Sequence, residues 1–280
     1  MRLLWATDLH LEFTDDFLLQ RFLSLLASTP CDAIVLTGDI SSGRALKQHM
    51  LGLAAAGKSK PIYVVLGNHD FYHSSFAQVG GVMEEVCGTA EAPNLKELGH
   101  GEVIPLGEQS ALIGHRGWGD GRGGLGSRSD VELNDFRLIT DLHSDTKRQL
   151  FAKLASLGKA SANYFRETLP VALAQYDHVW IATHVPPFEC AAWHEGANSD
   201  PEYLPHFSNV SAGEAIREIA EHYPAKRITV LCGHTHSSGT AFPAPNIRVL
   251  TGGAVYGSPR IAAVLNPDDL AEWDAPGTHR

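Results

Sequence analysis

Five short segments of the sequence share one arrangement, in which a run of apolar residues ends in side chains that can bind a metal ion. These segments are Asp8-Leu9-His10, Gly38-Asp39, Gly67-Asn68-His69-Asp70, Thr183-His184 and Gly233-His234-Thr235-His236. Each follows a short stretch of apolar and β-branched residues, which is typical of a buried strand. Chance readily supplies one such segment, whereas five after strand-like stretches indicate one site assembled from distant parts of the chain.

The alternation of strand-like and amphipathic stretches predicts an α/β fold. Strands are expected at residues 3–6, 33–37, 62–66, 111–114, 179–183, 228–232, 247–251 and 261–265. Helices are expected at residues 16–27, 45–56, 79–86, 146–174 and 211–222. Because the N-terminal order is βαβαβ, we expect a mainly parallel sheet with helices packed on it.

We predict a single domain over residues 1–280, because candidate ligands lie near both ends of the chain. A chain of 280 residues is also long enough for two small domains. Residues 114–145, which are rich in glycine, and residues 186–209 are predicted to form long functional loops rather than linkers.

Composition excludes some classes of function. The formal charge of −10 argues against general nucleic-acid binding, although bound cations can still attract a phosphorylated substrate. No apolar run reaches the roughly 18 residues that a membrane span needs. The four cysteines form no C-x-x-C pair and the N-terminus lacks a secretory pattern, so we expect a cytoplasmic protein with reduced thiols. No sequence feature indicates an oligomeric state.

Two glycine-rich patterns resemble nucleotide-binding motifs but occur in the wrong context. Residues 52–59 match G-x-x-x-x-G-K-S, yet a helix-like stretch precedes them and a strand follows, which reverses the order of a P-loop. Residues 119–124 match G-x-G-x-x-G, yet no amphipathic helix opens after them. We interpret the second pattern as a loop near the site, where Trp118, Asp120 and Arg122 either contact substrate or are solvated. The same alternatives apply to His194.

The candidate ligands all follow predicted strands, and the carboxyl ends of strands are where sites form in open α/β sheets. Asp8 and His10, like His234 and His236, are two residues apart, so in an extended chain both members of a pair would point to one face. Carboxylate, amide and imidazole donors without thiolate suit Mn²⁺, Fe or Zn²⁺ at a hydrolytic site better than a structural zinc. The number of donors suggests two ions.

The ordered set D-x-H, G-D, G-N-H-D, H and G-H-x-H resembles that of the calcineurin-like metallophosphoesterases, a family that includes purple acid phosphatases and cyclic-nucleotide phosphodiesterases. The resemblance spans Asp8 to His236. It implies a four-layer α/β/β/α sandwich with two central sheets, mixed and mostly parallel.

The resemblance also implies a role for each residue of the set. Asp39 bridges two metal ions. The first ion is bound further by Asp8, His10 and His236. The second ion is bound further by Asn68, His184 and His234. His69 lies near the phosphate with Asn68 and stabilises or protonates the leaving oxygen, and Asp70 orients His69.

We therefore expect a binuclear metal-dependent phosphoesterase that hydrolyses phosphate mono- or diesters by in-line attack of a metal-bridging hydroxide. The two divalent or trivalent ions are expected to be manganese, with iron, zinc or nickel as alternatives. The expected substrate is a phosphorylated small molecule or a phosphoprotein, with no membrane partner. The alternative function is a non-catalytic metal-binding scaffold of the same fold.

Overall fold

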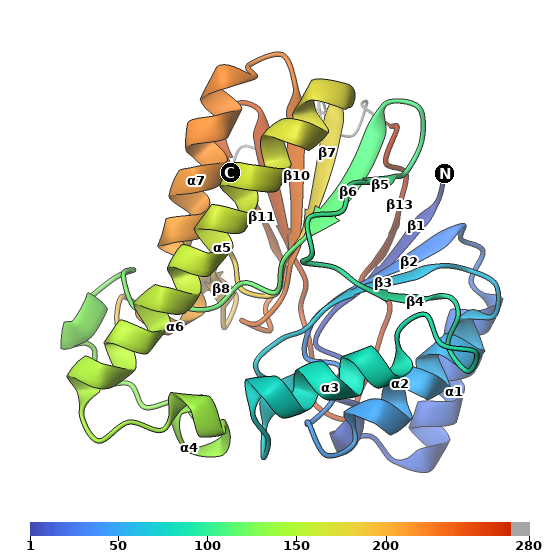
Figure 1. Ribbon diagram of the computed structural model, residues 1–280, viewed down its shortest axis with the longest axis horizontal. Helices are drawn as coiled ribbons and strands as arrows, with labels where there is room; N and C mark the ends of the chain where they lie inside the picture. Colours follow the sequence, from blue (N-terminus) through green and yellow to red (C-terminus); the bar gives the residue numbers. More distant parts are fainter. Residues whose placement is uncertain (270–280) are drawn as a thin grey trace.

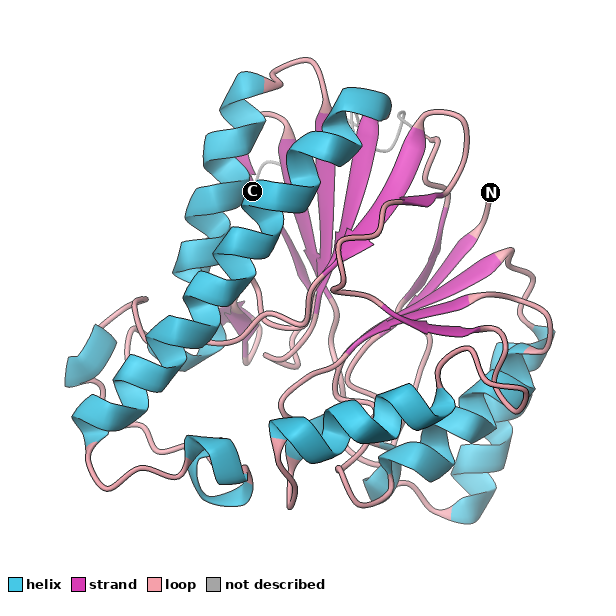
Figure 2. Cartoon of the chain, in the orientation of Figure 1, coloured by secondary structure: helices cyan, strands magenta, loops and turns pink. Residues whose placement is uncertain are grey.

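Two β-sheets stack face to face between two layers of helices in the computed structural model, which describes residues 1–269 (Figures 1 and 2). The predicted domain limit at residue 280 lies outside the described residues. The arrangement of two sheets between two helix layers confirms the predicted four-layer sandwich with two mixed, mostly parallel sheets.

The first sheet has the strand order β13-β1-β2-β3-β4. Its strands are β1 (Leu3–Ala6), β2 (Ala33–Thr37), β3 (Ile62–Val65), β4 (Leu95–Glu97) and β13 (Ala263–Leu265). The strands β1, β2, β3 and β4 pair in parallel with one another, and β13 runs antiparallel to β1. Parallel pairing places the carboxyl ends of β1, β2 and β3 at one edge of the sheet.

The second sheet has the order β11-β12-β10-β7-β6-β5. Its strands are β5 (Ile104–Pro105), β6 (Ser110–Gly114), β7 (His178–Ala182), β10 (Arg227–Cys232), β11 (Gly239–Ala244) and β12 (Ile247–Thr251). The central strands are parallel, and the edge strands β5 and β11 are antiparallel. A separate hairpin pairs β8 (Trp193–His194) with β9 (Ala197–Asn198).

The helices cover the outer faces of the two sheets (Figure 1). The helices on the first sheet are α1 (Asp16–Ser28), α2 (Leu46–Gly57) and α3 (Phe76–Val86). The helices on the second sheet are α5 (Lys147–Gln175) and α7 (Val210–His222). Two short helices, α4 (Asp135–Leu138) and α6 (Leu204–Phe207), lie within the two predicted loops. No helix within residues 1–269 combines the length and the apolar character needed to cross a bilayer.

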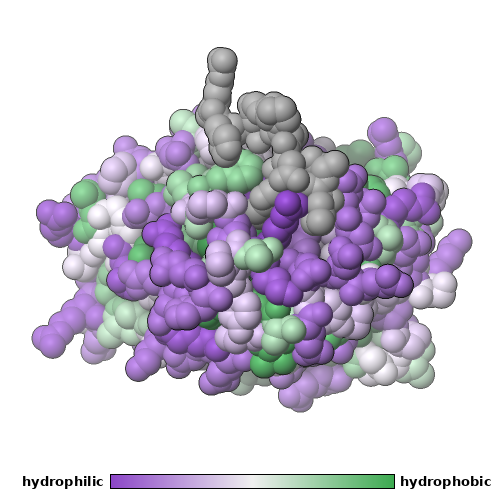
Figure 3. Space-filling view, turned by 90° about the horizontal axis from the view of Figure 1, so that it is seen from above, coloured by the Kyte–Doolittle hydropathy of each residue, from purple (hydrophilic) through white to green (hydrophobic). Residues whose placement is uncertain are grey.

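Large apolar side chains join the two sheets. Leu3 and Trp5 of the first sheet belong to the same buried cluster as Leu112, Trp180 and Leu231 of the second. Full burial of such side chains stabilises the fold by about 1.5–3 kcal/mol each. This contact fixes the two sheets relative to one another and so brings their carboxyl edges together. The face shown in Figure 3 is mostly hydrophilic with scattered apolar side chains, as expected outside the core.

One difference from the predicted elements has a clear physical cause. Strand β11 was not predicted, because Gly239 and Pro243 both disfavour strands, and Pro243 is tolerated at a sheet edge. Residues 52–57 of the P-loop-like pattern lie inside α2, and Lys58 ends the helix with φ of 57°. A helix therefore precedes Lys58 and strand β3 follows it, so this segment does not form a P-loop, as the order of the elements indicated.

Candidate metal centre

The carboxyl ends of five strands, from both sheets, meet near the centre of the molecule (Figure 1). The predicted ligands that follow them form two groups of converging donor atoms. The first group consists of Asp8, His10, Asp39 and His236. The second group consists of Asp39, His184 and His234. Asp39 belongs to both groups, so one carboxylate faces two clusters of donors.

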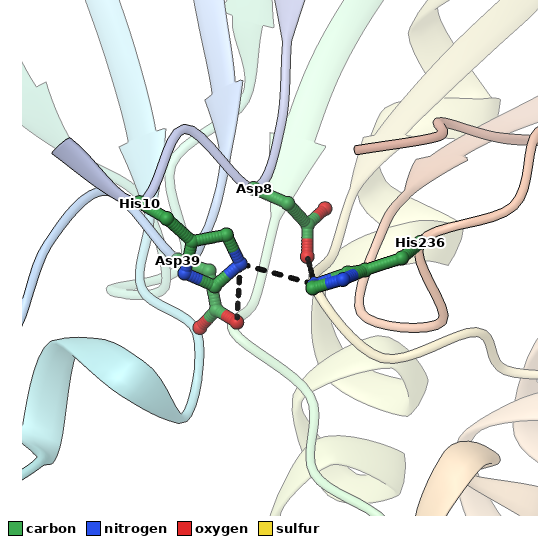
Figure 4. A group of neighbouring side chains, drawn as sticks. All are labelled: Asp8, His10, Asp39 and His236. Atoms are coloured by element: carbon green, nitrogen blue, oxygen red, sulfur yellow. Dashed lines mark hydrogen bonds and ion pairs between the residues drawn. The ribbon is translucent and has the colours of Figure 1, made fainter. Parts of the chain in front are cut away.

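The first group surrounds a single point between the two sheets (Figure 4). The Nε2 atoms of His10 and His236 lie 3.0 Å apart, and His10 Nε2 lies 3.8 Å from Asp39 Oδ2. His236 Nε2 lies 3.5 Å from Asp8 Oδ1. Donor atoms that are each about 2.1 Å from one ion are about 3–4 Å apart. These spacings therefore suit a single bound cation.

The second group gains an oxygen donor from Asn68. Asn68 Oδ1 lies 3.0 Å from His184 Nε2 and 3.0 Å from His234 Nδ1, and His184 Nε2 lies 3.3 Å from Asp39 Oδ1. The other ring nitrogens face carbonyl groups, at 2.9 Å from Thr37 O for His184 and 3.2 Å from His206 O for His234. Such contacts fix which imidazole nitrogen is left to coordinate.

The backbone is left-handed, not extended, at five of the seven predicted ligands. The φ angles are 49° at Asp8, 45° at His10, 51° at Asp39, 72° at His234 and 61° at His236. Such angles are unusual in residues other than glycine and occur often at functional sites. The expectation that paired ligands converge because they are extended is therefore wrong. The members of the two pairs, Asp8 with His10 and His234 with His236, converge because the chain turns sharply at each of these four residues.

Two glycines allow this close approach of the backbone. A Cβ at Gly67 would collide with the carboxylate of Asp39, and a Cβ at Gly233 would collide with the carboxylate of Asp8. Both glycines directly precede a predicted ligand, so the glycine of each motif has a steric role.

The electrostatics of the cluster suit a cation. Burial would raise the pKa of Asp39, but the charges of His184 and His69 lower it well below its usual range. Burial would lower the pKa of His184, but Asp39 raises it to about 10. Burial lowers the pKa of His10 to about 4 and that of His234 to about 3. The cluster thus offers an ionised carboxylate at Asp39 and neutral imidazoles at His10 and His234.

Asp70 does not orient His69, which corrects the prediction. Its carboxylate accepts hydrogen bonds from the backbone nitrogens of Ile40 and Ser41, both at 2.9 Å, and of Gly67 at 2.8 Å. His69 and Asp70 are neighbours in the 3-10 helix His69–Phe71, where successive side chains point about 120° apart. Asp70 therefore points away from the ring of His69, and its hydrogen bonds stabilise the turns that carry Asp39 and Asn68.

The carboxylate that faces His69 is Glu12, with Oε1 3.8 Å from His69 Nδ1. The side chains of Glu12 and His69 are 14% and 13% exposed, so the pair is largely shielded from water. Glu12 lies two residues after the ligand His10, in the 3-10 helix Leu11–Phe13. The sequence did not single it out, because its contact with His69 exists only in the folded chain.

Three residues predicted to contact substrate make structural contacts instead. Trp118 is buried against Phe76, with ring centroids 5.4 Å apart. Asp120 is buried and accepts hydrogen bonds at 2.7 Å from both the backbone nitrogen and the hydroxyl of Ser211. Arg122 forms a two-point ion pair with Glu214, at 2.6 and 2.8 Å. The loop is packed against α5, α6 and α7. None of the three side chains lines the open cavity over the ligands, although Trp118 lines a small cavity beside Asn68 and His184.

An open cavity of about 330 Å³ lies over the ligands. His69 and His194, two predicted substrate-binding residues, line it together with Tyr72, Asp135 and Tyr256, which the sequence did not indicate. The ring of Tyr256 lies 4.5 Å from that of His10, and half of its side chain is exposed. Burial raises the pKa of Tyr256, so its hydroxyl stays protonated. Tyr256 follows the carboxyl end of β12, which is the only signal that could have found it.

Comparisons with known proteins agree with this geometry. The chain matches the family model of the calcineurin-like phosphoesterases over residues 1–238. A dimetal phosphatase from Danio rerio has a similar structure, with a TM-score of 0.56, 14% identity, and coverage of 92% of this chain and 88% of that one. A search of the curated proteins finds no match.

Two further solved structures resemble the chain more weakly. A protein of Thermus thermophilus has a TM-score of 0.48 at 14% identity, covering 90% of this chain and 88% of that one. A 5'-nucleotidase from Candida albicans has a TM-score of 0.46 at 12% identity, covering 90% of this chain and 45% of that one. The family match, which covers most of the chain and every predicted ligand, establishes that this protein belongs to the calcineurin-like phosphoesterase family.

Proposed function

We propose that this protein is a binuclear metal-dependent phosphoesterase that hydrolyses phosphate mono- or diesters. The observation that carries the proposal is the position of Asp39, whose carboxylate belongs to two groups of donor atoms. A carboxylate shared in this way is what a pair of neighbouring ions needs. Membership of a phosphoesterase family supports a hydrolase over other classes of enzyme.

The donors divide between the two ions as the groups do. Asp8, His10 and His236 would hold the first, with Asp39 shared between the two. Asn68, His184 and His234 would hold the second. When bound, such a pair of cations lowers the pKa of a coordinated water and neutralises charge on phosphate oxygens. Mixed oxygen and nitrogen donors favour manganese, with iron, zinc or nickel as alternatives.

His69 acts on the leaving group in this proposal. Its ring lines the open cavity beside Asn68 and Asp39, so an ester bound over the ligands would place an oxygen within reach of the imidazole. His69 would donate a proton to that oxygen as the ester bond breaks. Glu12, which faces the other ring nitrogen, would keep the imidazole oriented.

The substrate proposed is a phosphorylated small molecule or a phosphoprotein. The cavity of about 330 Å³ is open enough to accept either. Neither a membrane surface nor nucleic acid in general is proposed as a partner, since the net charge of −10 disfavours both anionic surfaces. We also propose a cytoplasmic location, because all four cysteines are free thiols and reducing compartments keep thiols in that state.

The test is hydrolysis by chelator-stripped protein to which Mn²⁺, Fe²⁺, Zn²⁺ or Ni²⁺ is returned. The substrates are p-nitrophenyl phosphate, bis-p-nitrophenyl phosphate, cyclic nucleotides and phosphopeptides. We expect turnover of at least one substrate that depends on added metal and is lost in Asp39→Asn. Binding of two ions without turnover of any substrate would contradict the proposal and favour the non-catalytic scaffold.

A further inference from the structure

Asp135 is a buried carboxylate beside the candidate metal centre, but it is not one of the predicted ligands. It lines the open cavity together with Asn68, His69 and Tyr72, yet its side chain is only 4% exposed. It begins α4, within the long glycine-rich segment of residues 114–145. Its position raises the question of what this loop contributes to the site.

One hydrogen bond to Asp135 determines the orientation of the Asn68 amide. Asn68 Nδ2 donates to Asp135 Oδ1 at 2.9 Å. Asp135 Oδ1 accepts hydrogen bonds from both Asn68 and Tyr72, so the amide nitrogen faces Asp135 and the amide oxygen faces the other way. That oxygen is the atom that lies 3.0 Å from both His184 Nε2 and His234 Nδ1. Asp135 thus presents the correct atom of Asn68 to the second group of donors.

A second hydrogen bond joins Asp135 to Tyr72, whose ring contacts that of His69. The hydroxyl of Tyr72 donates to the same oxygen, Asp135 Oδ1, at 2.7 Å. The ring of Tyr72 stacks on that of His69, with centroids 4.1 Å apart and planes 26° apart. Asp135 therefore fixes the aromatic surface against which the imidazole of His69 lies.

Backbone contacts hold α4 against the segment that carries Tyr72. His73 N donates to Leu138 O at 2.8 Å, and Thr140 N donates to Ser74 O at 3.0 Å. Phe76 N, at the start of α3, donates to Asp141 Oδ2 at 2.8 Å. Figure 1 shows α4 beside the beginning of α3. The carboxylate is thus held in place by a folded segment.

We propose that Asp135 is a positioning residue that holds the Asn68 amide oxygen toward the second metal ion and, through Tyr72, supports the ring of His69. The inference rests on the proposed function, because the orientation of Asn68 matters only if the second group of donors binds an ion. In this proposal the loop of residues 114–145 supplies the residue that positions Asn68. Partners that orient metal ligands in this way typically contribute about 10- to 100-fold to metal affinity.

The test is a calorimetric titration of chelator-stripped protein with Mn²⁺. We expect Asp135→Ala to weaken one of two binding steps by about 10- to 100-fold and to leave the other unchanged. Asp135→Asn keeps an oxygen acceptor at the same place and is expected to restore most of the affinity. Tyr72→Phe removes only the connection to His69, so it should leave Mn²⁺ binding unchanged while lowering kcat more than it changes KM.

Controls make each outcome decisive. Asn134→Ala changes an exposed neighbour in the same cavity and should bind Mn²⁺ as the wild type does. If Asp135→Ala fails to fold by circular dichroism, Asp135→Ser, which is too short to reach both donors, replaces it. If a folded Asp135 variant that lacks the acceptor binds both ions with wild-type affinity, the positioning role of Asp135 is wrong, and the proposed function still stands. Failure of the wild-type protein to bind Mn²⁺ would instead overturn the proposed function.

Discussion

The ends of the parallel strands and the loop of residues 114–145 contribute to the same site by different means. The ends of β1, β2 and β10 supply candidate metal ligands at sharp turns, fixed by the register of the sheet and by close backbone packing. The loop supplies Asp135, which is fixed by hydrogen bonds between side chains and between backbones that are distant in sequence. Strand ends therefore define which atoms meet, and the loop defines how they are oriented.

This contrast predicts that changes at a strand end abolish the site, whereas most changes in the loop only loosen it. The largest effect is expected for Asp39→Asn, because loss of the shared charge weakens both groups of donors at once. We expect kcat/KM to fall by about 10³-fold and elemental analysis to find fewer than two metal ions per chain. Asp130→Asn, an exposed change in the loop, is the matched control. Full metal occupancy in Asp39→Asn would show that Asp39 is not shared.

The next largest effect is expected for His69→Ala. His69 lies near the end of β3, but in our account it binds no metal. Metal content should stay at the wild-type level, while kcat falls by about 10²- to 10⁴-fold through loss of a proton donor. Metal analysis beside steady-state kinetics separates the two properties. An unchanged kcat would remove the catalytic role of His69.

A smaller effect is expected for Asp120→Ala, in the glycine-rich part of the loop. The substitution leaves the partly buried backbone nitrogen of Ser211 without its acceptor, which costs about 1–3 kcal/mol of the free energy of unfolding. Chemical denaturation should record this loss, while kcat/KM of the folded protein changes by less than about threefold, because Asp120 lies outside the cavity. A large loss of kcat/KM at unchanged stability would restore the substrate-binding role that the sequence suggested.

The smallest effect is expected for Arg122→Ala. Its ion pair with Glu214 is exposed, and such pairs contribute about 0.2–1 kcal/mol. Stability and kinetic constants should both remain close to those of the wild type, and the free energy of unfolding should become less dependent on salt. A marked rise in KM would contradict the structural role and show that this part of the loop does reach the substrate.

The sequence was sufficient to predict which candidate ligands converge, but not which residues contact them. Asp8, Asp39 and His184 could be identified because each directly follows a strand-like stretch, and order along the chain restricts which strand ends meet. Glu12 and Asp135 could not be identified, because their contacts with His69 and Asn68 depend on a loop conformation that no periodicity encodes.

The errors have local causes. Asp70 was expected to orient His69 because the resemblance implies a carboxylate partner for this imidazole, but the two neighbouring side chains diverge in a 3-10 turn. The paired ligands were expected to be extended, but the chain is left-handed at Asp8, where Gly233 makes room for the carboxylate. Both errors arise where turn geometry overrides the regular pattern of a strand.

The most direct test of the account is electron paramagnetic resonance of the Mn²⁺-loaded protein, combined with elemental analysis of the same sample. We predict two manganese ions per chain with the spectrum of a magnetically coupled pair, since a shared carboxylate holds such ions about 3.5–4 Å apart. We predict that Asp39→Asn loses the coupled spectrum. One ion per chain, or two ions that give only the spectrum of isolated Mn²⁺, would contradict the account.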